Sequence, residues 1–192
     1  LYKKEVLRFL NVIGQTILGP IITSALFLLV ISLAIGDSRS DVLGVPYINF
    51  LLPGLIAMQV IGQAFSHSSS SLLMGKVMGN IVDTISAPLS AVEVTFAIVL
   101  ASVTRSLIIA LVSVILFSLW IEINFQNFFF IIIYLFLSSF ILGACGFITG
   151  LWAEKFDHMS SVTNFLIVPL SFLSGTFYSV DRLPHFLQLI SE

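Results

Sequence analysis

A long stretch without a single charged residue, from Gln15 to Ile35, constrains this chain more than any other feature. Its 21 residues, wound as an α-helix that rises about 1.5 Å per residue, would span about 30 Å, the thickness of a bilayer's hydrocarbon core. Only 9% of all residues are charged and the mean hydropathy is +1.10, whereas a soluble domain has about 25% charged residues. Counting this stretch, the predicted membrane spans are 15–35, 48–65, 94–121, 128–152 and 162–180. The sequence therefore predicts an all-α integral membrane protein, with one transmembrane domain over residues 1–192.

The two ends of the sequence suggest that this domain is incomplete. The chain begins at Leu1 rather than at a methionine and stops at Glu192, after an amphipathic stretch. We therefore expect both ends to be cut, so that five is a minimum number of spans. Apolar residues in the tail, from Phe186 to Ile190, predict a helix that dips into the membrane interface.

The first eleven residues, LYKKEVLRFLN, mix charged and apolar side chains just before the first span. The charged ones are Lys3, Lys4, Glu5 and Arg8. This mixture predicts an amphipathic helix that lies at the membrane surface. The alternative is a charged flank that only precedes the first span.

A loop between the second and third spans, Gly75 to Pro88, has the features of a contact point for a soluble partner. Val77, Ile81 and Ile85 recur every four residues, which predicts a short amphipathic helix that the proline stops. The pair Gly75-Lys76 is not a phosphate loop, because the first glycine and the final Ser or Thr of that motif are missing. No nucleotide site is therefore predicted in this chain.

Three polar side chains fall inside predicted spans. Gln59 and Gln63 are four residues apart and share one helix face, where they either join neighbouring helices or line a transport path. Arg105 lies well inside the third span, about 18 Å along the helix from Glu93. Its guanidinium either lines a path or snorkels to the near interface.

Other motifs predict packing rather than chemistry. His67 is followed by the four serines 68–71, but no suitably placed Asp or second His accompanies it, so the cluster is interpreted as the polar end of the second span. Gly146 and Gly150 form a GxxxG motif, which allows two helices to approach closely. Cys145 has no second cysteine for a disulfide and is expected to be a small packing residue.

The distribution of charge predicts the orientation. The net charge of −2 argues against a nucleic-acid partner. A cytoplasmic N-terminus places Arg39 and Arg182 outside, and it places a larger set of cations at the cytoplasmic side: Lys3, Lys4, Arg8, Lys76 and Lys155. Positive residues favour that side, so the loop 75–88 is predicted to be cytoplasmic.

Several segments together resemble the membrane subunit of ABC-2 type transporters, the family of drug, polysaccharide and lipo-oligosaccharide exporters. The most specific is EKFDHMSSVTNFLIVPLSFLSGTFYSVDRLP at 154–184. The others are KEVLRF at 4–9, FLLPGLIAM at 50–58, ISAPLSAVEV at 85–94 and TRSL at 104–107. The resemblance covers essentially the whole chain. It implies a permease with six spans, the last missing here, which forms a homodimer with two separate cytoplasmic ATPase subunits.

The resemblance also implies roles for particular positions. The first ten residues become the interface helix, with Lys4, Glu5 and Arg8. Residues 181–192 become the start of an extracellular re-entrant helix. Ser174, Gly175 and Tyr178 lie near the exit path. The coupling helix that docks on the ATPase includes Lys76, Gly79, Val82, Asp83, Ala87 and Pro88.

The resulting hypothesis is the permease subunit of an ATP-driven exporter in the bacterial inner membrane. The chain itself is not an enzyme and holds no metal or cofactor, since ATP and magnesium belong to the partner. An alternative is an ATP-independent secondary transporter or channel, although no Asp or Glu lies within a predicted span core. A passive membrane anchor is a third interpretation. The substrate is left open.

Overall fold

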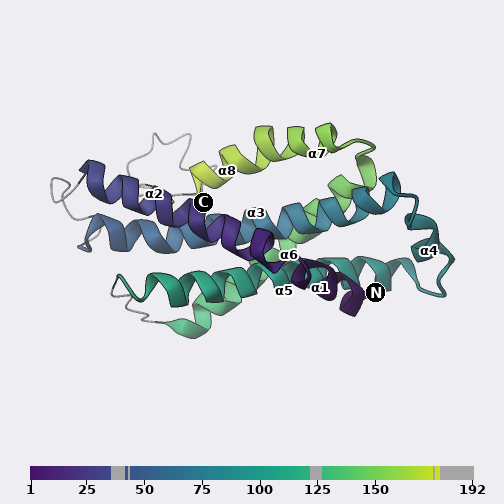
Figure 1. Cartoon of the computed structure of the whole chain (residues 1–192), viewed down its shortest axis with the longest axis horizontal. Coiled ribbons are helices and arrows are strands. Elements are labelled where there is room, and N and C mark those ends of the chain that lie inside the picture. The colour runs from purple at the N-terminus through teal and green to yellow at the C-terminus, as the bar shows by residue number, and fades with distance from the viewer. Residues whose placement is uncertain (36–41, 43, 122–126, 175, 178–192) are drawn as a thin grey trace.

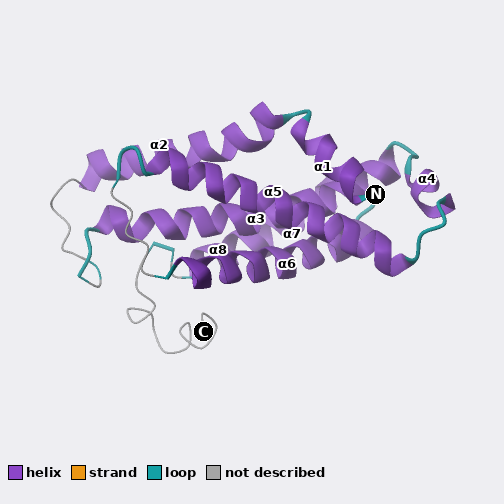
Figure 2. Ribbon diagram, turned by 90° about the horizontal axis from the view of Figure 1, so that it is seen from below, coloured by secondary structure: helices purple, strands orange, loops and turns teal. Residues whose placement is uncertain are grey.

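The structure is a computed structural model that describes residues 1–35, 42, 44–121, 127–174 and 176–177. In these residues every regular element is helical, and the long helices lie side by side in one elongated bundle (Figure 1, Figure 2). In chain order the elements are α1 (Tyr2–Leu10), a π-helical turn η1 (Gly14–Leu18), α2 (Gly19–Ile35), α3 (Tyr47–Val77), α4 (Ile81–Ser86), α5 (Ala91–Phe117), α6 (Phe128–Trp152), α7 (Phe156–Val162), a second π-helical turn η3 (Thr163–Ile167) and α8 (Val168–Leu173). The predicted all-α class is confirmed.

Four stretches of helix in the described residues are long and apolar enough to cross a membrane. They are Gly14–Ala34, Tyr47–Val77, Ala91–Phe117 and Phe128–Trp152. The fifth predicted span, 162–180, falls on the end of α7, on η3 and α8, and then on residues outside the described part. The re-entrant helix predicted at 181–192 also lies outside it, so the fifth span and this helix stay predictions.

Large apolar side chains cover the outside of the bundle. Phe165 is 83% exposed, and Leu33, Phe129 and Ile148 are each more than half exposed. Burial of apolar surface is favourable in water, so a soluble protein would not leave so many of these side chains uncovered. The hydrocarbon of a bilayer is the solvent that suits this surface.

Helix α3 lies at the centre of the bundle and packs most extensively against α6. Gly146 and Gly150 of α6 form the contact. A Cβ atom added at Gly150 would lie 2.8 Å from the Ser69 carbonyl oxygen, and one added at Gly146 would collide with the Phe65 carbonyl oxygen. Only glycine allows the two backbones to come this close, so the close helix approach predicted from the GxxxG motif is confirmed.

Helix α3 is longer than the sequence predicted. The second span was expected to end near Phe65, with the serines as a polar helix end, but the helix continues to Val77. The serines do not end the helix because they are used inside it: Ser68 and Ser69 are fully buried, and the Ser69 hydroxyl donates to the Phe65 carbonyl at 2.8 Å. The Ser69 hydroxyl is thus satisfied on its own helix, and small side chains at this face leave room for α6.

The loop Gly75 to Pro88 does contain a short helix that ends before the proline, but the helix is shorter than predicted. The first residues of the loop belong to α3, which stops at Val77, and the short helix α4 starts only at Ile81. Gly79 separates the two with a φ of 75°, in the left-handed region that other residues adopt only at a cost. The predicted apolar face of Val77, Ile81 and Ile85 is therefore divided between two helices.

The contact between α3 and α6 predicts that Gly146→Ala destabilises the protein. The added methyl group meets the backbone of α3, which cannot move aside, so we expect a loss of about 1–3 kcal/mol in the free energy of unfolding. Thermal unfolding of the purified protein in detergent measures it. Gly62→Ala is the matched control, because a Cβ at Gly62 meets nothing within 4 Å. Equal stability of the two variants would contradict the contact.

Candidate functional site

Four polar side chains of α3 follow one another at intervals of four residues: Gln59, Gln63, His67 and Ser71. Residues four apart lie one above the other on a helix, so these four form a continuous line along one face. We call it the polar stripe. Its members contact three of the surrounding helices, α1, α2 and α5, so the stripe is the axis of the site.

The stripe begins at Gln59, which joins α3 to α2. Its Nε2 atom donates to the Pro20 carbonyl at 2.7 Å and also contacts the Ser24 hydroxyl. These bonds show the helix-joining role that was one of two alternatives for Gln59. The side chain also lines a groove of about 490 Å³ between α2, α3 and α8, so the transport-path alternative stays a prediction.

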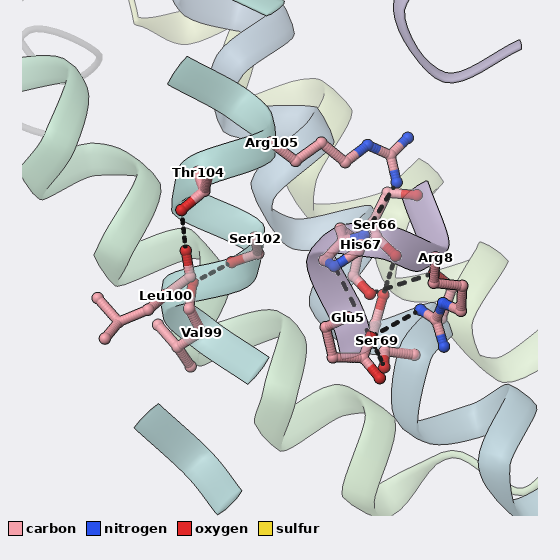
Figure 3. Close-up of polar contacts among 12 residues, drawn as sticks. Glu5, Arg8, Ser66, His67, Ser69, Val99, Leu100, Ser102, Thr104 and Arg105 are labelled. Atoms are coloured by element: carbon pink, nitrogen blue, oxygen red, sulfur yellow. Dashed lines mark hydrogen bonds and ion pairs between the residues drawn. The ribbon is translucent and has the colours of Figure 1, made fainter. Parts of the chain in front are cut away.

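The middle of the stripe holds Arg105 of α5. The guanidinium donates to Gln63 Oε1 at 2.7 Å. It also contacts His67 Nδ1 at 3.1 Å; both Arg105 and His67 are labelled in Figure 3. Since a guanidinium can only donate, the His67 Nδ1 atom accepts, and the ring hydrogen sits on Nε2. The side chain of Arg105 is therefore bound to α3 instead of extending alone toward the interface.

The last part of the stripe holds α1 against the bundle. The carboxylate of Glu5 is buried, with the residue 5% exposed, and accepts from the Ser71 hydroxyl at 2.7 Å. The same carboxylate forms an ion pair with Arg8 at 3.1 Å and lies 3.9 Å from His67 Nε2 (Figure 3). Phe9 adds an edge-to-face contact with the His67 ring. Helix α1 therefore exists as predicted, and its inner face is fixed by a buried carboxylate.

The residues predicted to couple to an ATPase lie at the same end of the bundle as α1, but they differ in exposure. Lys76 turns inward: its ammonium donates to the Ala153 carbonyl at 3.1 Å and contacts the Leu151 carbonyl, at the end of α6. A cation there stabilises the negative end of the helix dipole. Gly79, Val82, Asp83 and Pro88 are exposed and Ala87 is half-buried.

The predicted exit residues are described only in part. The Ser174 hydroxyl donates to the Ser171 carbonyl at 2.7 Å, which ends α8. Gly175 and Tyr178 lie outside the described residues. Beyond residue 175, the ring of Phe177 stacks on the ring of Phe172, and both rings line the groove between α2, α3 and α8.

The sequence indicated Gln59, Gln63 and Arg105 as candidate site residues. It did not indicate that His67 and Ser71 belong to the same polar stripe. Both had been assigned to a helix end. The signal was present, because the four-residue interval that joins the two glutamines continues through His67 to Ser71. The four-residue interval could not identify Glu5 as the buried partner of Ser71. The sequence of α1 does not indicate which of its charged residues faces the bundle.

The stripe predicts that Arg105→Ala destabilises the protein by about 1–3 kcal/mol, because the Gln63 oxygen and the buried His67 Nδ1 lose their donor. Thermal unfolding in detergent measures this loss. The control is Lys155→Ala. Lys155 is an exposed cation whose side chain has no hydrogen bond or ion pair with any described residue, so a change in the free energy of unfolding within about 0.5 kcal/mol is expected. A stable Arg105→Ala variant would show that the guanidinium does not join α5 to α3.

Comparison with known proteins places this architecture in a family. The model of the ABC-2 type transporter family matches residues 1–192. The chain is 30% identical over 192 residues to the inner membrane transport permease YadH of Escherichia coli K12, an alignment that covers 100% of this chain and 75% of the relative. The proteins of that name from Escherichia coli O157:H7 and Shigella flexneri match to the same extent. No solved structure matches the chain. This chain therefore belongs to the ABC-2 type transporter family and is a membrane transport permease.

Proposed function

We propose that this permease is the membrane subunit of an ATP-driven exporter, and that a separate cytoplasmic ATPase docks on α4. The observation that carries the proposal is the apolar surface of α4. Val82 is 62% exposed and Ile85 is 75% exposed, on a helix of six residues in which nothing is buried. Unlike the lipid-facing side chains of the bundle, these belong to a loop between two spans, where an exposed apolar patch is typical of a protein interface.

The distribution of charge supports a cytoplasmic position for α4. Lys76 and Lys155 lie near the ends of α3 and α6, and Lys3, Lys4 and Arg8 belong to α1, which lies at the same end of the bundle as α4 (Figure 1, Figure 2). Arg39 and Arg182, expected at the opposite side, lie outside the described residues. A concentration of positive charge favours the cytoplasmic side, which gives a cytoplasmic N-terminus in an inner membrane like that of the YadH relative.

Helix α4 is connected so that a force on it reaches the spans. It follows α3 after a turn of three residues, and α5 begins at Ala91 with a capping box in which Ser90 and Glu93 bind each other's backbone. The polar stripe then ties α3 to α1, α2 and α5. ATP binding that closes the two ATPases would therefore shift the whole group of helices between inward- and outward-facing populations.

The path that the substrate takes is proposed to follow the groove between α2, α3 and α8. Its wall combines the amides of Gln59 and Gln63 with the rings of Phe27, Phe172 and Phe177. A second copy of the chain, also with its own ATPase, would close the groove into a path. The sixth span and the re-entrant helix complete each subunit in this proposal.

The coupling role predicts that Val82→Asp or Asp83→Arg releases the ATPase without affecting membrane insertion. A charge in an apolar contact, or a reversed charge at its edge, should lower the amount of ATPase that co-purifies by at least about tenfold. The measurement is a pull-down of the tagged full-length permease after mild solubilisation, with the subunit ratio read from the gel.

Asp157→Arg is the matched control, because it reverses an exposed carboxylate at the start of α7 outside the α4 surface. It should retain a 1:1 ratio of permease to ATPase. Retention of the ATPase by both α4 variants would contradict docking on α4. Transport by vesicles that contain the permease alone would instead favour the ATP-independent transporter.

A further inference from the structure

A small polar pocket of about 170 Å³ lies at the end of the bundle that carries α4, enclosed by α1, α3, α4 and α5. Its polar lining comes from three elements and the turn before α4: Lys4, Glu5, Arg8, Ser71, Asn80 and Thr84. The coupling proposal uses none of these side chains as a ligand site. The pocket is nevertheless the place where the surface helix meets the α4 loop.

The charges that line this pocket do not cancel. Glu5 is occupied by its ion pair with Arg8 and by the Ser71 hydroxyl. Lys4 has no ion pair or hydrogen bond with any described residue, so the lining carries one uncompensated positive charge. An anion is the ligand that would balance it.

Two uncharged polar groups complete the lining on the α4 side. Asn80 precedes α4 but its side chain does not cap the helix, and the half-buried Thr84 hydroxyl has no partner among the described residues. An amide and a hydroxyl can both donate to an oxyanion. Together with the ammonium of Lys4, they give an anion three donors, from α1, from α4 and from the turn before α4.

The depth of the pocket relative to the membrane surface indicates which anion can reach it. The exposed side of α1 and of the turn after it combines the cation Lys3 with the apolar side chains of Leu7, Leu10, Val12 and Ile13. A helix with this face lies at the boundary between headgroups and acyl chains. The pocket lies on the other side of α1, and its lining also includes Leu72, Met74 and Ile98. Polar donors beside apolar side chains at this depth match a lipid phosphate attached to its glycerol.

We propose that this pocket binds the phosphate of an anionic phospholipid from the cytoplasmic leaflet. Basic pockets between spans on the cytoplasmic side are suited to such headgroups. The phosphate accepts from Lys4 of α1 and from Asn80 and Thr84 at α4, and so connects the surface helix to the ATPase-docking loop. Phospholipid composition would then set how firmly that loop is held.

The test is a titration of the purified full-length protein, in neutral detergent and without any ATPase, with fluorescent phosphatidylglycerol. Phosphatidylcholine, which has the same glycerol phosphate but no net charge, is titrated in parallel. Phosphatidylglycerol should bind at least about tenfold more tightly, and Lys4→Gln and Thr84→Val should each weaken it by about five- to tenfold.

Lys3→Gln is the matched control, because Lys3 carries the same charge on the same helix and does not line the pocket. It should change the affinity less than twofold. Equal losses from Lys3→Gln and Lys4→Gln would overturn the pocket in favour of general attraction to the surface. Equal binding of the two lipids would also overturn it. Tight binding of soluble glycerol phosphate, abolished by Lys4→Gln, would overturn the lipid as the source of the phosphate.

Discussion

The rest of this structure depends on the close packing of α6 against α3. Without water or a strong hydrophobic drive inside a bilayer, helices associate through close van der Waals contact, and two glycines of α6 make that contact possible at Phe65 and Ser69. Because one face of α3 is filled by α6, its polar stripe turns toward α1, α2 and α5. The glycine contact and the stripe are thus two faces of one central helix.

The stripe also explains how a membrane helix can carry so many polar groups. A polar group in hydrocarbon must find its partner within the protein, and the stripe members do so on three neighbouring helices: Gln59 on α2, Gln63 and His67 on α5, and Ser71 on α1. Arg105 is the most demanding case, since a charged guanidinium in a span requires acceptors, and Gln63 and His67 supply them. Such a set of mutually dependent contacts is suited to hold helices together while they move as a group.

Both proposals concern the same end of the bundle. The α4 surface, on which we propose that an ATPase docks, has no buried residue, and the polar pocket lies between α4 and α1. Lys76, which the family resemblance placed in the coupling helix, binds the carbonyl of Ala153 at the end of α6 near this region. This end of the bundle is therefore built from the termini of several helices, so a partner or lipid bound there would contact all of them.

The sequence by itself determined the class of this protein. Uncharged stretches of about 20 residues have the length of a membrane-spanning helix, in which every backbone group is satisfied within the segment, and the GxxxG spacing indicated a close helix contact in advance. Local pattern failed at the serines and at the loop after them, where it ended α3 too early and joined two helices into one. Only the tertiary structure decided those boundaries, since a serine ends a helix or continues it according to what packs against it. It also decided that Glu5 turns inward and that Arg105 is bound, because a charged side chain in a sequence does not reveal which distant residues will lie beside it.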